Sequence, residues 1–342
     1  MKKAKFFKKL KNKIVQCQTC AHYCVISPGQ RGICGIRENK NGELFLLTWG
    51  KAIAVNLDPI EKKPFYHFLP GTSSLSFATV GCNFSCPWCQ NYEISQSTKD
   101  PQLKFRLPIL GEDWPPKKLV KTALSLGAKS LSYTYTEPTV FFEYALDTMK
   151  LAKKAGLKNN WVTNGYMTEK VQKAIIPFLD AVNIDLKFFS QRKYQRYCRA
   201  KLTPVLKTIK EFFKAKVHIE ITTLIIPKLN DSEKELSQIA QFIADLSPLI
   251  PWHISRFFPA YKFQDVSPTP FSAIEKAVEI GKKAGLKFIY TGNLPDSYLQ
   301  DTICPKCKAV LIKRRGYKTE IVNLTKTGRC QKCGFDAKII VE

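Results

Sequence analysis

The chain lacks several features that would assign it to common protein classes. No part of its 342 residues approaches the roughly 18 consecutive apolar residues of a membrane span, so we expect no membrane association. The basic N-terminal segment has neither an apolar core nor a cleavage site, which argues against a secretory signal. No G-x-G-x-x-G motif is present, which argues against a dinucleotide-binding fold.

Acidic residues are scarce as well. The chain has 28 Asp and Glu against 54 Lys and Arg, a formal net charge of +26 at pH 7. A positive field of this size indicates an anionic partner, which the sequence leaves open among nucleic acid, an acidic reductase and an acidic protein substrate. No RNA-binding fold signature accompanies the charge, and lysine-rich chains also occur in thermophiles.

Cysteine, by contrast, is abundant. Of the 12 cysteines, Cys198 stands alone and the others fall into three sets with metal-type spacing. This usage predicts a reducing compartment, the cytoplasm, because a disulfide-bonded secreted protein of this size would rarely use cysteine in this way.

The middle set has the spacing C-x3-C-x2-C and consists of Cys82, Cys86 and Cys89. Three thiolates at this spacing can bind three irons of a cubane [4Fe-4S] cluster and leave the fourth iron without a protein ligand. An open coordination position marks a reaction site, as it does for catalytic zinc. We therefore predict that these cysteines are both metal ligands and catalytic residues.

The C-terminal set predicts a zinc ribbon. Two C-x2-C pairs flank a spacer with the alternating, β-branched pattern of short antiparallel strands, and their ligands are Cys304, Cys307, Cys330 and Cys333. Four thiolates close a tetrahedron around one zinc and leave no open position, so we expect a structural metal that stabilises a small module.

The N-terminal set predicts a third metal site of undecided type. Its cysteines are Cys17, Cys20, Cys24 and Cys34. Four sulfurs suit either zinc or a second iron–sulfur cluster. His22 lies between the second and third cysteines and is an alternative ligand, although the set is complete without it.

Between the terminal modules the chain alternates strand-like and helical segments. The predicted strands are residues 75–80, 129–135, 159–165, 181–189, 216–226, 252–259 and 287–293. Nearly continuous apolar strands that alternate with amphipathic helices indicate a parallel sheet covered by helices. Six or seven such units favour an α/β fold with a TIM-like β/α barrel, full or partial.

Polar residues follow several of these strands, and in such a barrel the chemistry collects at the carboxyl ends of the strands. The candidate cofactor-binding residues at these strand ends are Thr136, Glu137, Asn164, Asp185, Lys187 and His253. Glu137 also precedes a proline and has a second interpretation as a helix cap. For His253, a packed core histidine is an equally reasonable interpretation.

The cysteine triplet followed by Gln90-Asn91 is the signature of radical S-adenosylmethionine (SAM) enzymes. Together with the segments TYTEPT, NIDLKFF and PWHISRFFP, it makes nearly the whole chain resemble the radical SAM enzymes of the AmmeMemoRadiSam system, relatives of pyruvate formate-lyase activating enzyme. The resemblance places Asn164, Asp185, Lys187 and His253 at SAM-contact or active-site positions. The resemblance implies that TYTEP replaces a Gly-Gly-Glu motif and that Glu137 binds the SAM amino group. Tyr135 and Thr136 stand where that motif has glycines.

The resemblance also implies a reaction. A reduced [4Fe-4S] cluster cleaves SAM to methionine and a 5′-deoxyadenosyl radical, which abstracts hydrogen from an unidentified protein or small-molecule substrate. A flavodoxin-like or ferredoxin-like protein supplies the electron. The alternatives are a glycyl-radical-enzyme activase and an RNA-directed modification enzyme or nucleic-acid-binding metalloprotein. We expect three parts: a basic segment with the four-cysteine module (1–70), the barrel (71–298) and the zinc ribbon (299–342).

Overall fold

A single curved sheet forms the centre of the computed structural model, which describes residues 1–101, 103, 111–294 and 299–342. Its eight strands have the order β16-β15-β14-β13-β12-β11-β9-β8. The parallel strands are β9 (Ser73–Ala78), β11 (Ser130–Tyr133), β12 (Lys158–Thr163), β13 (Ala181–Asp185), β14 (His218–Ile225), β15 (Trp252–Arg256) and β16 (Ile289–Gly292). Each overlaps a strand predicted from the sequence, which confirms the α/β fold with a mostly parallel sheet.

The barrel is partial. β8 (Ala54–Pro59) adds an antiparallel strand beside β9, and β8 and β16 are the two edges of the sheet in the described residues. The alternative of a full barrel is therefore wrong. β8 lies within the range assigned from sequence to the N-terminal module, yet it pairs with the main sheet along its whole length.

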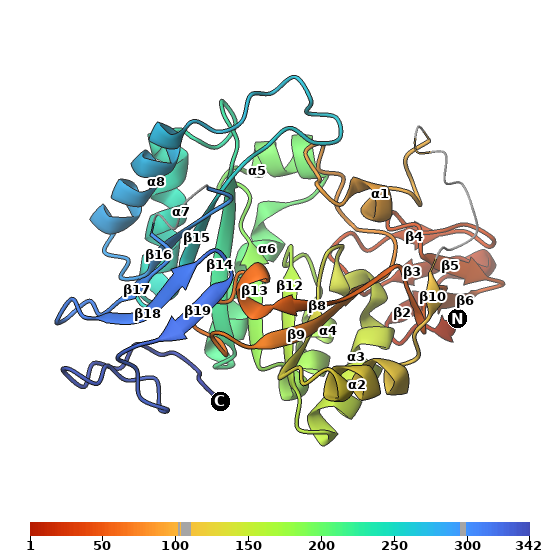
Figure 1. The fold of residues 1–342 in the computed structure, drawn as a ribbon. Coiled ribbons are helices and arrows are strands. Elements are labelled where there is room, and N and C mark those ends of the chain that lie inside the picture. Colours follow the sequence, from red (N-terminus) through yellow and green to blue (C-terminus); the bar gives the residue numbers. More distant parts are fainter. Residues whose placement is uncertain (102, 104–110, 295–298) are drawn as a thin grey trace.

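Helices cover the outer face of the sheet (Figure 1). They are α2 (Pro116–Ser125), α3 (Phe142–Lys154), α4 (Glu169–Ile175), α6 (Leu202–Lys214), α7 (Glu233–Leu246) and α8 (Phe271–Lys283). Each buries an apolar stripe against the strands, and Trp161 and Trp252 are fully buried between the layers. Two short helices, α1 (Tyr92–Ser95) and α5 (Gln191–Lys193), lie in loops after strands.

The two cysteine modules lie at opposite sides of the barrel (Figure 1). The N-terminal module contains small antiparallel sheets formed by β1 (Lys2–Lys3), β2 (Phe7–Lys9), β3 (Val15–Cys17), β4 (Val25–Ile26), β5 (Arg37–Lys40), β6 (Glu43–Leu46), β7 (Lys51–Ala52) and β10 (Glu112–Asp113). The C-terminal module contains β17 (Thr302–Ile303), β18 (Val310–Arg315) and β19 (Lys318–Ile321). The antiparallel β18–β19 hairpin is the strand pair that the spacer pattern predicts.

The helices of the described part of the chain are too short or too polar for a membrane span.

Candidate active site

One cavity of about 560 Å³ lies at the carboxyl ends of the parallel strands. All three cysteines of the middle set line it. The predicted SAM-binding residues in its wall are Thr136, Glu137, Asn164, Asp185 and Lys187. The structure therefore gathers residues from the loop after β9 and from the ends of β11, β12 and β13 around one space.

The loop that carries the triplet packs closely against the N-terminal module. Gly81, directly before Cys82, has φ +91°, and a Cβ at this position would lie 2.6 Å from the carbonyl oxygen of Cys34. Lys99 donates from its Nζ to the carbonyl of Cys82 at 2.8 Å. Burial raises the pKa of the Cys82 thiol, so a bound metal would have to supply the energy that ionises it.

Glu137 is buried in the cavity wall, and both of its carboxylate oxygens accept hydrogen bonds. Its Oε1 accepts from the backbone and hydroxyl of Thr139 and from the hydroxyl of Thr163, and its Oε2 accepts from the backbone N–H of Asn164 at 2.8 Å. Burial raises its pKa, and these bonds partly offset the shift. Glu137 is thus both the cap of the 3₁₀ turn Pro138–Phe141 and a carboxylate of the site.

Tyr135 has a left-handed backbone conformation, which glycine adopts more easily than tyrosine. Its φ is +61°, a left-handed value that is rare for a bulky residue and often marks functional sites. Asn91 donates to its carbonyl at 2.7 Å, and its hydroxyl donates to Asp58. The hydroxyl of Thr136 donates to the carbonyl of Thr79 at 2.9 Å. The turn therefore keeps its shape without glycine.

Asp185 and Lys187 form an ion pair of 2.8 Å in the cavity wall. Their two-residue spacing predicts a shared face, and the structure shows it. Burial alone would lower the pKa of Lys187, but the Asp185 carboxylate together with the Cys86 and Cys198 sulfurs outweighs burial, so the pKa lies above the usual range. Lys187 is therefore a fixed positive charge in the site.

His253 is the predicted SAM-binding residue that does not line the cavity. Its Nε2 lies 2.6 Å from Oε2 of Glu220, and its ring packs edge-on against Tyr66. It is the second residue of β15, so it lies deeper in the barrel than the strand end. Ser255, two residues further on the same face, reaches the cavity instead. The structure thus favours the packed core histidine.

Several cavity residues escape sequence analysis. Lys63 is almost fully buried in the wall, and its Nζ lies 2.6 Å from Asp58, which comes from the antiparallel edge strand β8. A double lysine in a polar loop is typical of a solvated face, so this burial has no clear sequence signal. Tyr317 lies in the β18–β19 turn and brings the C-terminal module to the cavity wall.

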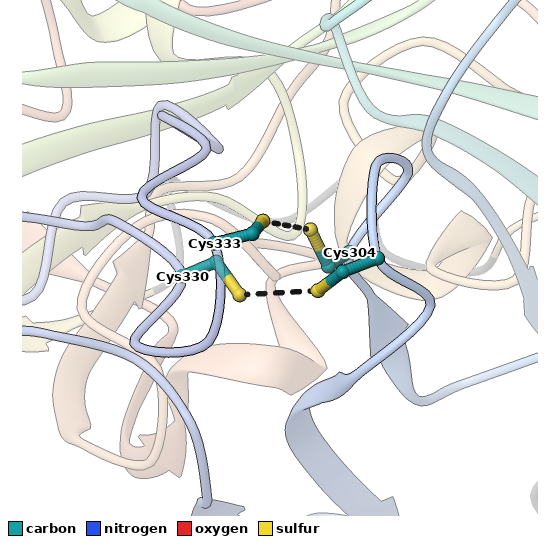
Figure 2. A group of neighbouring side chains, drawn as sticks. Cys304, Cys330 and Cys333 are labelled. Atoms are coloured by element: carbon teal, nitrogen blue, oxygen red, sulfur yellow. Dashed lines mark hydrogen bonds between the residues drawn. The ribbon is translucent and has the colours of Figure 1, made fainter.

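The four C-terminal cysteines converge on one point (Figure 2). Their sulfurs all lie within 4.8 Å of one another, and the Cys304–Cys333 and Cys307–Cys330 pairs are each 3.6 Å apart. A tetrahedron with a metal–sulfur bond of about 2.3 Å has edges of about 3.8 Å. This arrangement fits one four-coordinate metal ion, as a zinc ribbon requires.

The four N-terminal cysteines surround a small pocket together with Arg37. Among the described residues, the C-terminal set alone brings its sulfurs within 4.8 Å, so the N-terminal sulfurs are more widely spaced. His22 does not line this pocket: its Nε2 lies 2.8 Å from the carbonyl oxygen of Asn83. The cysteines, without His22, are therefore the candidate ligands.

The geometry defines a class of protein: a partial β/α barrel with a three-cysteine site at the carboxyl ends of its strands. Comparisons identify it further. Residues 77–242 match the model of the Radical SAM superfamily. The uncharacterized protein MJ0808 of Methanocaldococcus jannaschii is 40% identical over 343 residues and is covered, like this chain, over 100% of its length.

Two more distant matches agree. The mitochondrial GTP 3′,8-cyclase of Arabidopsis thaliana is 23% identical over 228 residues, which is 63% of this chain and 57% of that protein. A crystal structure of a radical SAM methyltransferase from Sphaerobacter thermophilus has a TM-score of 0.50 at 13% identity and covers 72% of this chain and 71% of its own, which shows a shared fold. The chain belongs to the radical SAM superfamily and is a radical SAM enzyme. Membership implies a [4Fe-4S] cluster, SAM, a reductant and a substrate.

Proposed function

We propose that Cys82, Cys86 and Cys89 hold the cluster and that the surrounding cavity binds SAM. The observation that carries this proposal is the gathering of the three thiols with Glu137 and Asn164 in one cavity. These cysteines would hold a cluster whose chemistry, when it is bound, would be the one-electron reductive cleavage of SAM to methionine and a 5′-deoxyadenosyl radical, which would abstract hydrogen from substrate.

The residues of the chain bind and orient SAM and the substrate, and they exclude water. Glu137 presents a buried carboxylate for the SAM amino group, and Lys187 supplies a fixed cation for an anionic group of SAM or substrate. Thr136 and Asn164 offer polar atoms at neighbouring strand ends. A closed, preorganised wall protects a radical from solvent.

Anaerobic reconstitution with iron and sulfide tests this proposal. Dithionite and SAM are added, and 5′-deoxyadenosine is measured. We expect product from the wild type and none from the Cys82/Cys86/Cys89→Ala variant. Cys198→Ala is a comparison variant that should still form product, since Cys198 is a buried cysteine outside the triplet, although its sulfur lies 3.8 Å from that of Cys86. A wild type that carries a cubane cluster and forms no product would contradict the proposal.

We infer that the two other cysteine sets hold different metals. The converging C-terminal sulfurs support a single structural zinc. The wider N-terminal spacing around a pocket supports a polynuclear iron–sulfur cluster, because each cysteine then binds a different iron. Iron analysis should give about eight irons per chain and about four in a Cys17/Cys20→Ser variant. Four irons in both proteins would contradict a second cluster.

We also propose a finer family assignment and a cellular setting for the protein. Sequence resemblance favours the AmmeMemoRadiSam group, and a glycyl-radical activase is the alternative; a glycyl-radical EPR signal on a co-incubated partner enzyme would distinguish them. Twelve free cysteines, eleven of them in metal-type sets, support a reducing cytoplasm. We further propose that the chain divides into three parts at residues 70 and 298.

A further inference from the structure

A second cavity, of about 940 Å³, lies on the other side of the cluster loop. Successive residues of the loop alternate between the two cavities. Residues 82, 84, 86 and 88 line the active-site cavity, whereas Asn83, Ser85 and Pro87 line the second one. The opposite wall of the second cavity is the loop 29–33 of the N-terminal module. We call this space the basic groove.

The groove is strongly positive. Its only acidic lining residue among those described is Asp100, and its basic lining residues are Arg31, Lys99, Arg196, Arg199 and Lys262. Asp100 is already paired with Lys262 at 2.8 Å, and Arg31 with Glu38 at 2.9 Å.

Three of these basic residues pair with no carboxylate among the described residues: Lys99 is half-buried and donates to backbone carbonyls of the cluster loop, whereas the other two are exposed arginines. Arg196 and Arg199 are exposed, and in the described part of the chain neither forms an ion pair with a carboxylate. A guanidinium that is not neutralised within the protein is available to a carboxylate of a partner.

The segment that carries these arginines contacts the cluster loop directly. The backbone N–H of Ser85 donates to the carbonyl of Cys198, and the sulfurs of Cys198 and Cys86 are 3.8 Å apart. The rings of Tyr197 and Trp88 pack with their centroids 6.1 Å apart, and Trp88 lines the active-site cavity. A molecule in the groove is therefore separated from the cluster ligands by a single layer of residues.

We propose that the basic groove is the docking site of an acidic, low-potential one-electron carrier protein. This inference rests on the proposed function. In the step that it serves, one electron leaves the carrier, which is oxidised, and enters the cluster of this chain, which is reduced; no bond is formed or broken. Docking in the basic groove lets the electron enter from that side of the cluster loop while SAM and substrate occupy the active-site cavity on the other side.

The size and charge of the groove fit such a carrier. Electron-transfer encounters are small and transient, so a compact patch beside the redox centre is sufficient. Complementary charge raises the association rate and makes it dependent on salt. A nucleic acid would more commonly be bound along an extended basic stripe.

The test compares an Arg196→Glu/Arg199→Glu variant with the wild type. The control is Lys276→Glu/Lys283→Glu, which makes the same charge change on α8, at the other end of the sheet (Figure 1). Binding of a purified oxidised flavodoxin to each protein is measured by calorimetry at low and high salt. In parallel, 5′-deoxyadenosine formation is driven by reduced flavodoxin or by dithionite, a small reductant that needs no docking site.

We expect the groove variant to bind flavodoxin at least tenfold more weakly and to lose flavodoxin-driven product to a similar extent. Its dithionite-driven rate should stay unchanged, and the control should behave as wild type. Equal loss in both variants would overturn the proposal, as would equal loss with both reductants. Unchanged flavodoxin binding with lost binding of a single-stranded RNA would assign the groove to nucleic acid instead. Absence of dithionite-driven product in the wild type would contradict the proposed function and leave the binding comparison readable.

Discussion

The side-chain amide of Asn164 donates a hydrogen bond of 2.7 Å to Oδ1 of Asn83. This contact joins the end of β12 to the residue directly after the first cluster cysteine. Both side chains are buried. The strand that presents one wall of the proposed SAM site is thereby linked to the loop that would hold the cluster.

A double-mutant cycle tests this link. Asn83→Ala and Asn164→Ala should each weaken SAM binding about tenfold, because each leaves a buried polar partner without its bond. The double variant should be little worse than either single variant. SAM titration followed by the EPR spectrum of the reduced cluster measures the three affinities. Additive losses would show that the two residues act independently.

The buried pair of Arg37 and Glu143 links the N-terminal module to α3. The guanidinium Nη1 lies 3.1 Å from Glu143 Oε1, and both side chains are almost fully buried. Glu143→Gln should lower the free energy of unfolding by about 3 to 5 kcal/mol, since it leaves a buried charge unpaired. Urea unfolding measures this.

An exposed pair provides the control for that change. Glu169 lies 2.7 Å from Lys173 on the surface of α4, so Glu169→Gln should have a much smaller effect. If the two substitutions shift the unfolding midpoint equally, the buried pair does not anchor the module.

Lys63 should titrate abnormally. Burial lowers its pKa to about 8, although Asp58 partly opposes the shift. The unfolded chain then binds more protons than the folded chain between about pH 8 and the ordinary lysine pKa of about 10.4. The contribution of Lys63 to stability therefore rises with pH across this window, and is absent below it.

NMR of ¹³C-methylated lysines checks this expectation. One resonance should titrate near pH 8, and it should be missing from the Lys63→Arg variant. Lys62, which is half-exposed beside the same Asp58, should titrate far higher, since Asp58 raises its pKa. If every lysine titrated near its ordinary pKa, Lys63 would be solvated as its sequence context suggests.

Much of this architecture is predictable because it has a local signal. The seven parallel strands are short apolar runs between amphipathic helices, and their identity follows from periodicity alone. β8 has no such signal, because an antiparallel edge strand with exposed residues such as Asn56 and Leu57 resembles a loop.

The site shows the same division. Strand periodicity predicts which face of a strand a residue shares, so Asp185 and Lys187 are placed correctly. It does not predict depth along the strand, which is why Ser255 rather than His253 reaches the cavity. Contacts between distant segments, such as that of Asp58 with Tyr135, depend on tertiary packing.

Gly81 provides a test of how closely the N-terminal module and the cluster loop must pack. A methyl group at this position would lie 2.6 Å from the Cys34 carbonyl oxygen and 2.9 Å from the Ile36 side chain. Gly81→Ala should therefore push the module away from the loop. We expect it to lower both the free energy of unfolding and the iron content after reconstitution.

The left-handed backbone of Gly81 adds a cost that must be separated from the clash. Gly127 has φ +68° and no atom within 4 Å of an added Cβ, so Gly127→Ala carries the backbone cost alone, about 1 to 2 kcal/mol. Gly81→Ala should cost about 1 to 3 kcal/mol more, because overpacking adds to it. Urea unfolding and iron analysis of both variants measure the difference. Equal stability and equal iron content would mean that the module can move away from the loop freely, and that its cysteines need no fixed position behind the cluster.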